Sequence, residues 1–269
     1  MAKTVKSDWL NDYLANQGAL MSGHPTISTM LGISSDVLCC FRFIYDYSNG
    51  SIIYLLTIES TDSNEFQNFI DNNPRQSLKP FNDVFGSQLM VLFYSKSSFA
   101  LYDNSTNLIN SISSTDLQKV VSSLNSNLTT NIGSTKAINK SINDAFQAWT
   151  RSNLTKKCVV NDIDGFYYVE SGKSKFLELK RVEEDLDTWR PYLDDLPNYR
   201  ALREITNQLK GAMLVYAYQS ANENLLAMHY NLNTTSWNDI SGSYILAHPK
   251  FLLPSKIGSQ YVSTNRRVY

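Results

Sequence analysis

The sequence predicts a mixed α/β fold, in which a mixed β-sheet is flanked by helices and preceded by an N-terminal α+β part. In the second half of the chain, segments with the apolar spacing of helices alternate with apolar runs of strand length. In the first half, paired apolar runs rich in β-branched and aromatic residues flank short polar turns, which is typical of β-hairpins.

The N-terminal part is expected to begin with a short helix over residues 4–20. The runs DVLCCFRFIYDY and SIIYLLTIES, separated by SNG, predict one hairpin, and the runs QLMVLFYS and SFALYD predict a second. A helix is expected between the hairpins, at NEFQNFIDNN. A Ser- and Asn-rich helical region is then expected at about 107–131, where apolar residues follow a rough helical stripe.

The polar segment TNIGSTKAIN predicts a boundary between an N-terminal domain or elaboration over 1–131 and a second domain over 132–269. A new helix is expected over 134–151, because its apolar residues share one face. These residues are Ile138, Ile142, Phe146 and Trp149. Strands are expected at KKCVV, GFYYV and KFLELKR, followed by a helix over 198–211 and strands at AMLVYAYQ and LLAMHYNL.

Composition and charge are those of an ordinary folded protein. Of the 269 residues, 42% are hydrophobic and 18% are charged, and the formal net charge of −1 gives no global basic field for nucleic acid or anionic membrane. The cysteines number three, and the adjacent Cys39 and Cys40 stand in an apolar run, which predicts buried free thiols in a reducing compartment. Without a signal peptide, and without an apolar segment of about 18 residues, we expect a soluble, cytoplasmic protein with no membrane partner.

Charged residues gather on one predicted strand, KFLELKR. Glu178 and Lys180 are two residues apart, so both side chains emerge from the same face of the sheet. Leu177 and Leu179 then point the other way, into the core, and fix the direction of both charged groups.

Two acids stand on the preceding strand, in the segment NDIDGFYYV. If the intervening turn is centred near 170–172, Asp164 lies nearly opposite Glu178. Asp162 faces the same side, one strand step further away. Such a gathering of charges is either a solvated ion-pair ladder on an edge strand or a site for a hard cation, since Mg²⁺ prefers carboxylate oxygens.

This order of elements resembles the PD-(D/E)XK nuclease superfamily, which includes the restriction endonucleases. The shared pattern is a helix, an acid at the start of a strand, a hairpin, an apolar strand ending in Glu-X-Lys, and a further helix, over about 134–219. The resemblance implies a restriction endonuclease-like core that binds Mg²⁺, with Mn²⁺ as a substitute. It implies metal ligands from Asp164, Glu178 and the carbonyl of Leu179, with Asp162 as the rival first ligand.

The resemblance also implies roles for basic residues. Lys180 would be catalytic together with the two acids, by holding the attacking water or by offsetting charge on the phosphorus. Arg181, Arg200 and Arg203 would bind the phosphates of the substrate. The alternative for the two helical arginines is that they face solvent at ordinary helical spacing.

The chain departs from the family pattern in two places. The proline often found before the first aspartate is absent, since Asn161 and Ile163 stand there. On the first helix Asp144 is the one acid available, at a different helical angle from Phe146. Asp195, further along, is expected to serve at a turn or at the start of a helix rather than as a metal ligand.

The predicted function is therefore a Mg²⁺-dependent nuclease that hydrolyses phosphodiester bonds of DNA, and a restriction-type endonuclease is the first choice. A homodimer would place one site on each strand of the duplex. One alternative is a catalytically inactive nuclease-like module that binds nucleic acid or protein, which the near-neutral charge favours. The other is a junction- or RNA-processing nuclease of a mobile element.

Overall fold

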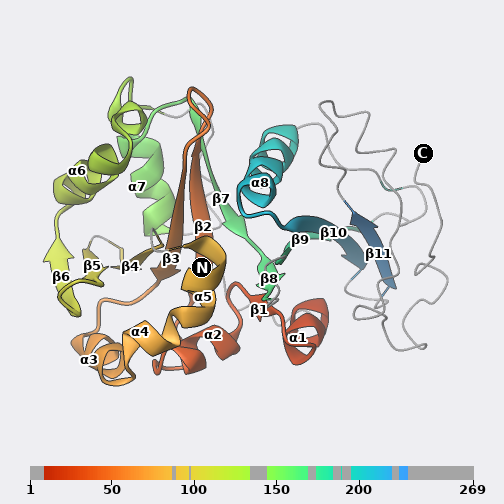
Figure 1. Cartoon of the computed structure of the whole chain (residues 1–269), viewed down its shortest axis with the longest axis horizontal. Helices are drawn as coiled ribbons and strands as arrows, with labels where there is room; N and C mark the ends of the chain where they lie inside the picture. Colours follow the sequence, from red (N-terminus) through yellow and green to blue (C-terminus); the bar gives the residue numbers. More distant parts are fainter. Residues whose placement is uncertain are drawn as a thin grey trace. The chain divides into compact units, whose positions relative to one another are not determined.

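The computed structural model describes residues 9–86, 89–96, 98–133, 144–168, 174–183, 189, 195–219 and 224–229. These residues form a mixed α/β structure with two mixed β-sheets flanked by helices, which confirms the predicted fold class (Figure 1). The chain divides into two compact units. The first comprises Met1–Lys6 and Ser22–Asp162, and the second comprises Ser7–Met21 and Ile163–Tyr269.

This division falls at a different place from the boundary expected near residue 131. Helix α7 (Ala145–Asn153) and all but the last residue of strand β7 (Cys158–Ile163) belong to the first unit. The physical reason is the apolar face of α7: Phe146 and Trp149 are buried in the same cluster as Leu92 of the first sheet. The expected buried face is thus confirmed for the part of the helix that the structure describes.

In the described part of the first unit, six strands form a sheet in the order β6-β5-β4-β3-β2-β7. They are β2 (Cys39–Asp46), β3 (Ile52–Ile58), β4 (Met90–Tyr94), β5 (Phe99–Asp103), β6 (Leu108–Ile112) and β7. Both predicted hairpins are confirmed, because β2 pairs with β3 and β4 pairs with β5 in antiparallel fashion. Strands β3 and β4 are parallel.

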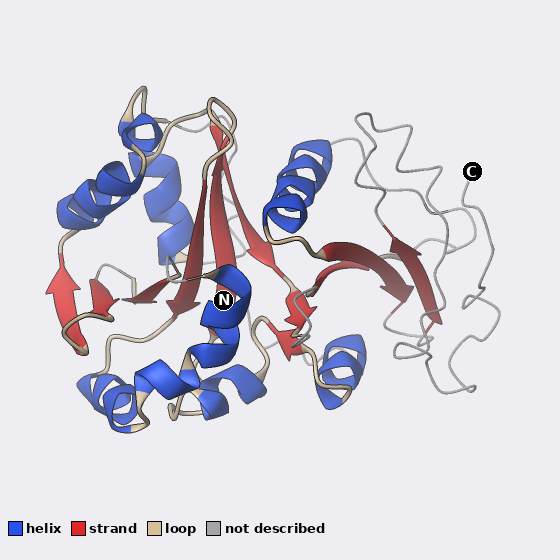
Figure 2. Cartoon of the chain, in the orientation of Figure 1, coloured by secondary structure: helices blue, strands red, loops and turns tan. Residues whose placement is uncertain are grey.

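Helices cover both faces of this sheet (Figures 1 and 2). On one face lie α6 (Ser114–Leu124) and α7, and on the other lie α3 (Ser63–Asp71), α4 (Pro74–Ser77) and α5 (Lys79–Phe85). Aromatic rings join helices to strands, since Phe81 of α5 packs on Phe41 with ring centroids 5.3 Å apart. The short helix α2 (Pro25–Met30) precedes β2, and the 3₁₀-helix η1 (Ser126–Thr129) follows α6.

The prediction of a helical region at about 107–131 is wrong for its first residues. Leu108–Ile112 form β6, which pairs antiparallel with β5, and α6 begins at Ser114 with Ser113 as its N-cap. The segment LINSI fits a strand period as well as a helical stripe. The pairing with β5 decides between them, because it satisfies the backbone hydrogen bonds of both strands.

In the described part of the second unit, five strands form a sheet in the order β1-β8-β9-β10-β11. They are β1 (Leu20–Met21), β8 (Gly165–Tyr167), β9 (Lys175–Arg181), β10 (Ala212–Gln219) and β11 (Asn224–His229). Strands β9 and β10 are parallel, and their connection contains α8 (Leu196–Gln208). The other pairs are antiparallel. The strands predicted at GFYYV, KFLELKR, AMLVYAYQ and LLAMHYNL are confirmed where the structure describes them, and the last residue of the first and the last three residues of the fourth lie outside the described residues.

Two helices flank the second sheet on opposite faces (Figure 1). Helix α1 (Trp9–Asn16) is shorter in its described part than the helix expected over 4–20. Its residues Leu10 and Leu14 share a buried cluster with Leu177 of β9. Helix α8 lies on the other face and buries Tyr199. Within the described ranges, no helix is long and apolar enough to cross a membrane.

Candidate active site

Asp164 and Glu178 are neighbours across the antiparallel pair β8–β9. The register joins Gly165 to Leu177, so the next residues outward along the two strands, Asp164 and Glu178, lie opposite each other. This is the placement that the sequence predicted. The two carboxylates also interact electrostatically, because the charge of Asp164 raises the pKa of Glu178.

The backbone of β9 fixes the carboxylate of Asp164. Its Oδ2 atom accepts a hydrogen bond of 2.7 Å from the backbone N–H of Leu179. In a strand the N–H and C=O of one residue point toward the same neighbouring strand, so the carbonyl of Leu179 faces the side on which Asp164 lies. Two carboxylates and one carbonyl are thus gathered where β8 begins.

Glu178 is an acid inside the protein, with 5% of its surface exposed. It lies on the face of β9 opposite to Leu177 and Leu179, both of which pack in the cluster that contains α1. Burial and, after it, the charge of Asp164 raise the pKa of Glu178 to about 7, although Lys180 acts in the opposite direction. Ionising such a group is costly unless a cation lies close to it.

Lys180 supplies a cation in this position. Its Nζ atom lies 2.9 Å from Oε1 of Glu178 and 2.9 Å from Oδ2 of Asp195, and 5.3 Å from the ring centre of Tyr199. Burial by itself lowers the pKa of Lys180, but Glu178, Tyr199 and Asp195 raise it by more. The ammonium group therefore stays protonated between two carboxylates.

Asp162, the rival of Asp164, has different partners. Its Oδ1 atom lies 3.1 Å from Nε of Arg42, within the first unit. Arg42 also donates two hydrogen bonds, of 3.2 and 2.6 Å, to Asp144, the N-cap residue of α7. The structure thus brings Asp164 to Glu178, whereas Asp162 and Asp144 are held by one buried arginine.

The arginines expected to bind substrate lie in different surroundings. Arg181, the last residue of β9, and Arg200 of α8 are exposed. Arg203 is half-buried and pairs with Glu204 at 2.8 Å. Arg181 and Arg200 are thus more exposed than Arg203, which pairs with its neighbour in the chain.

The donor set fits a magnesium ion that keeps much of its water. Among the described residues, no group of three or more His, Cys, Asp and Glu side chains could hold a metal ion. Mg²⁺ needs fewer, because it typically takes one or two carboxylates and completes its octahedron with water and substrate oxygens. Asp164 and Glu178, with the carbonyl of Leu179, meet that requirement.

Sequence reasoning missed two residues of this site, Asp195 and Tyr199. Asp195 was expected to serve only at a turn or a helix start, and Tyr199 lies in the helix expected over 198–211, with no role assigned to it. One signal could have found them: a helix that returns between parallel strands starts near the end of the first strand, where Lys180 lies. That geometry brings the first turn of α8 to the charged end of β9.

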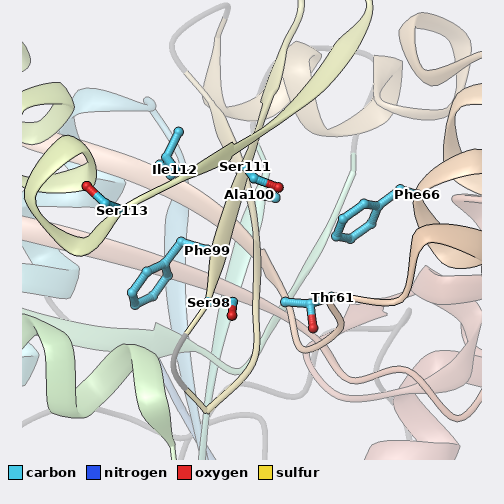
Figure 3. A pocket seen from close by; sticks show the side chains of 8 residues that line it. All are labelled: Thr61, Phe66, Ser98, Phe99, Ala100, Ser111, Ile112 and Ser113. Carbon is cyan, nitrogen blue, oxygen red and sulfur yellow. The ribbon is translucent and has the colours of Figure 1, made fainter.

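A hollow of about 530 Å³ in the first unit is separate from these residues (Figure 3). Its lining consists of Thr61, Phe66, Ser98, Phe99, Ala100, Ser111, Ile112 and Ser113. These side chains are hydroxyl-bearing or apolar, and none of them is charged, so the lining of the hollow contains no carboxylate for a hard cation.

Comparison with protein-family models gives no match for the chain, and comparison with curated proteins gives none either. The resemblance to the PD-(D/E)XK superfamily therefore stays a prediction that rests on the residues of the hairpin and on their geometry.

Proposed function

We propose that the protein is a metal-dependent nuclease of the PD-(D/E)XK type that hydrolyses phosphodiester bonds of DNA, and specifically a restriction-type endonuclease. One observation carries the proposal: Asp164 and Glu178 lie opposite each other across β8–β9, with Lys180 on the same face as Glu178. A solvated ion-pair ladder would leave Glu178 at the surface, whereas this acid is buried beside a second acid. Lys180 offers one positive charge, which it shares between Glu178 and Asp195, so the adjacent carboxylates of Asp164 and Glu178 favour a further cation, which supports a metal site.

The residues would divide the chemistry among them. Asp164, Glu178 and the carbonyl of Leu179 would hold Mg²⁺, or Mn²⁺ in its place. When bound, such an ion supplies Lewis acidity and lowers the pKa of water. Lys180 is protonated and half-buried, so it can orient the attacking water and offset the negative charge that grows on the phosphoryl oxygens.

The proposed substrate is DNA, and exposed arginines support it. Arg181 follows directly after Lys180 at the end of β9, on the other face of the strand, and Arg200 lies one residue after Tyr199; both are exposed. Guanidinium groups in such positions can pair with backbone phosphates. Cutting of both strands would be served by a homodimer with one site for each strand. The three cysteines are free, which supports a reducing compartment such as the cytoplasm.

A catalytically inactive nucleic-acid- or protein-binding module is the second candidate. The observation that favours it is the ion pair itself, because Nζ of Lys180 lies 2.9 Å from Oε1 of Glu178 and offsets its charge. In that case the charged face of β9 would serve stability only.

Cleavage of a mixed panel of plasmid and phage DNA tests the proposal. The protein is assayed with Mg²⁺, with EDTA, and as the Lys180→Ala variant, with Lys175→Ala on the opposite face of β9 as the matched control. Cutting that requires the metal and Lys180 but not Lys175 supports the nuclease. If the folded protein cuts no duplex, single-stranded or branched DNA, the binding module takes its place, and cutting of RNA or of junctions alone would redirect the substrate to the mobile-element alternative.

A further inference from the structure

Asp195 stands at the N-cap position of α8, yet its side chain does not cap the helix. No backbone N–H of α8 donates to its carboxylate, and its backbone is helical, with φ −84° and ψ −7°. The other aspartates at N-caps behave differently. Asp62 accepts from the N–H of Asn64 at 2.8 Å, and Asp144 accepts from the N–H of Gln147 at 3.0 Å, both with extended backbones.

The local sequence removes one of the two helical donors that an N-cap side chain can use. An N-cap side chain accepts from the N–H of the second or third helical residue. The second residue of α8 is Pro197, which has no N–H. The carboxylate turns instead to Lys180, 15 residues away in the chain, and accepts a hydrogen bond of 2.9 Å from its Nζ.

We propose that Asp195 is a positioning residue, which retains the ammonium group of Lys180 when Glu178 turns to a metal ion. This inference rests on the proposed function for its role in cleavage. In the geometry observed, Lys180 bridges Glu178 and Asp195 at equal distances, against the ring of Tyr199. A metal ion bound to Glu178 would weaken the ion pair between Lys180 and Glu178, and the ion pair between Lys180 and Asp195 would remain.

The positioning role has a chemical consequence. A lysine side chain has several rotatable bonds and a strongly hydrated head, so an ammonium group without a fixed partner moves toward solvent. With Asp195 as an anchor, Nζ stays beside the two carboxylates while a metal ion and a phosphate are bound. Asp195 would thus act on the reaction through Lys180, without touching metal or substrate.

The first test is independent of metal binding and of cleavage. Variant Glu178→Gln removes the charged partner on β9, so Lys180 then depends on Asp195 alone. The acylation rate of Lys180 with an amine-reactive reagent is measured by mass spectrometry, with Lys175 as the internal reference. The rate in Glu178→Gln is expected to stay within about twofold of the parent, and the double variant with Asp195→Asn is expected to react severalfold faster, because ion pairing to Asp195 is lost. The double variant with Asp62→Asn, another N-cap aspartate, is expected to behave like Glu178→Gln.

The result that would overturn the proposal is equal acylation of Lys180 in Glu178→Gln and in its double variant with Asp195→Asn. Because this measurement needs no cleavage, failure of the nuclease assay leaves it interpretable. If cleavage is found, Asp195→Asn is expected to lower kcat by roughly ten- to hundredfold with little change in KM, since mispositioned groups act at this scale. Asp195→Glu is expected to recover part of that loss, and an equal loss in Asp62→Asn would mean that the effect is not specific to Lys180.

Discussion

The carboxylate of Asp164 accepts a hydrogen bond of 2.7 Å from the backbone N–H of Leu179. Strand β8 begins at Gly165, so its backbone pairing with β9 starts opposite Leu177. The side chain of Asp164, which precedes the first residue of β8, thus accepts a hydrogen bond from a backbone N–H of β9 that no backbone carbonyl of β8 reaches. The side chain is therefore tied to the register of the hairpin that carries Glu178, and the spacing of the two acids follows from strand pairing.

Replacing Asp164 by Asn or by Ala separates its structural role from its chemical one. The amide oxygen of Asp164→Asn can still accept from Leu179, so we expect stability close to that of the parent and loss of cleavage. Asp164→Ala leaves a half-buried N–H without its acceptor, which costs about 1–2 kcal/mol of unfolding free energy. Urea denaturation of both variants, with DNA cleavage measured beside it, checks this. Cleavage retained by the Asn variant would remove Asp164 from the proposed metal site.

Glu178→Gln is expected to stabilise the metal-free protein at neutral and higher pH. The pKa of Glu178 is raised from 4.5 to about 7 by burial and by Asp164, so folding favours its protonated form. The stability linked to that form is fully present below the ordinary pKa and is lost as the pH rises through about 7. The variant stays neutral, so its advantage should be near zero at about pH 4 and reach on the order of 1–3 kcal/mol at about pH 8.

Thermal melting in EDTA across this pH range measures the effect of Glu178→Gln. Glu204→Gln, which changes an acid paired with Arg203 on α8, serves as the control and is expected to show no such trend. Destabilisation by Glu178→Gln at every pH would instead favour a structural ion pair between Glu178 and Lys180.

The local part of the site could be predicted from sequence, and its long-range part could not. The relative positions of Asp164 and Glu178 were expected from the strand period and from the centre assumed for the hairpin, and the register of β8 and β9 agrees with that expectation. The pairing of Lys180 with Asp195 depends instead on where α8 begins after β9. No periodicity encodes that contact, since it joins residues from different elements.

The same limit applies to the choice between the two candidate acids of the first strand. By strand period alone, Asp162 and Asp164 are equivalent, because residues two apart share a face. The structure distinguishes them through Arg42, which is more than 100 residues away from Asp162 in the chain. The sequence shows an arginine within an apolar strand, but it does not show which residues pair with that arginine.

Arg42 is expected to be critical for the stability of the first unit. Only 3% of its surface is exposed, and it pairs with Asp144 and Asp162. Its guanidinium carbon lies 5.7 Å from the ring centre of Tyr94 and 5.2 Å from that of Phe146. Arg42→Met removes the cation and leaves two acids partly buried, at a cost of about 3–5 kcal/mol. Arg42→Lys keeps the charge but loses the two-pronged geometry, so an intermediate cost is expected.

Hydrogen exchange, measured by mass spectrometry for each peptide, shows where in the structure the variants of Arg42 lose stability. Protection should fall in Arg42→Met for β2, β3 and α7, which belong to the same unit as Arg42. Equal stabilities of the Met and Lys variants would show that a positive charge without the bidentate geometry contributes little, and a Lys variant as stable as the parent would show that the bidentate pair with Asp144 contributes little.

Gly165 is expected to tolerate no side chain, because the paired strand β1 lies close against it. A Cβ atom at this position would overlap Sδ of Met21 and would lie 3.0 Å from the carbonyl oxygen of Leu20. The methionine can move but the backbone of β1 cannot do so cheaply, so we expect Gly165→Ala to cost about 1–3 kcal/mol. Because Asp164 is the preceding residue, a displacement of the backbone at Gly165 should also move Asp164 and lower the rate of DNA cleavage.

The double variant Gly165→Ala/Met21→Ala distinguishes crowding from a general weakening of the strand. Met21 is fully buried, so Met21→Ala alone should cost about 2–5 kcal/mol. If crowding against Sδ is the cause, the methyl group added by Gly165→Ala enters space vacated by the methionine, and the double variant should lose clearly less than the sum of the single losses. Chemical denaturation of the four proteins in the cycle gives the coupling free energy. Strict additivity would mean that the contact with the backbone of Leu20, and not the methionine, requires glycine beside the first acid of the site.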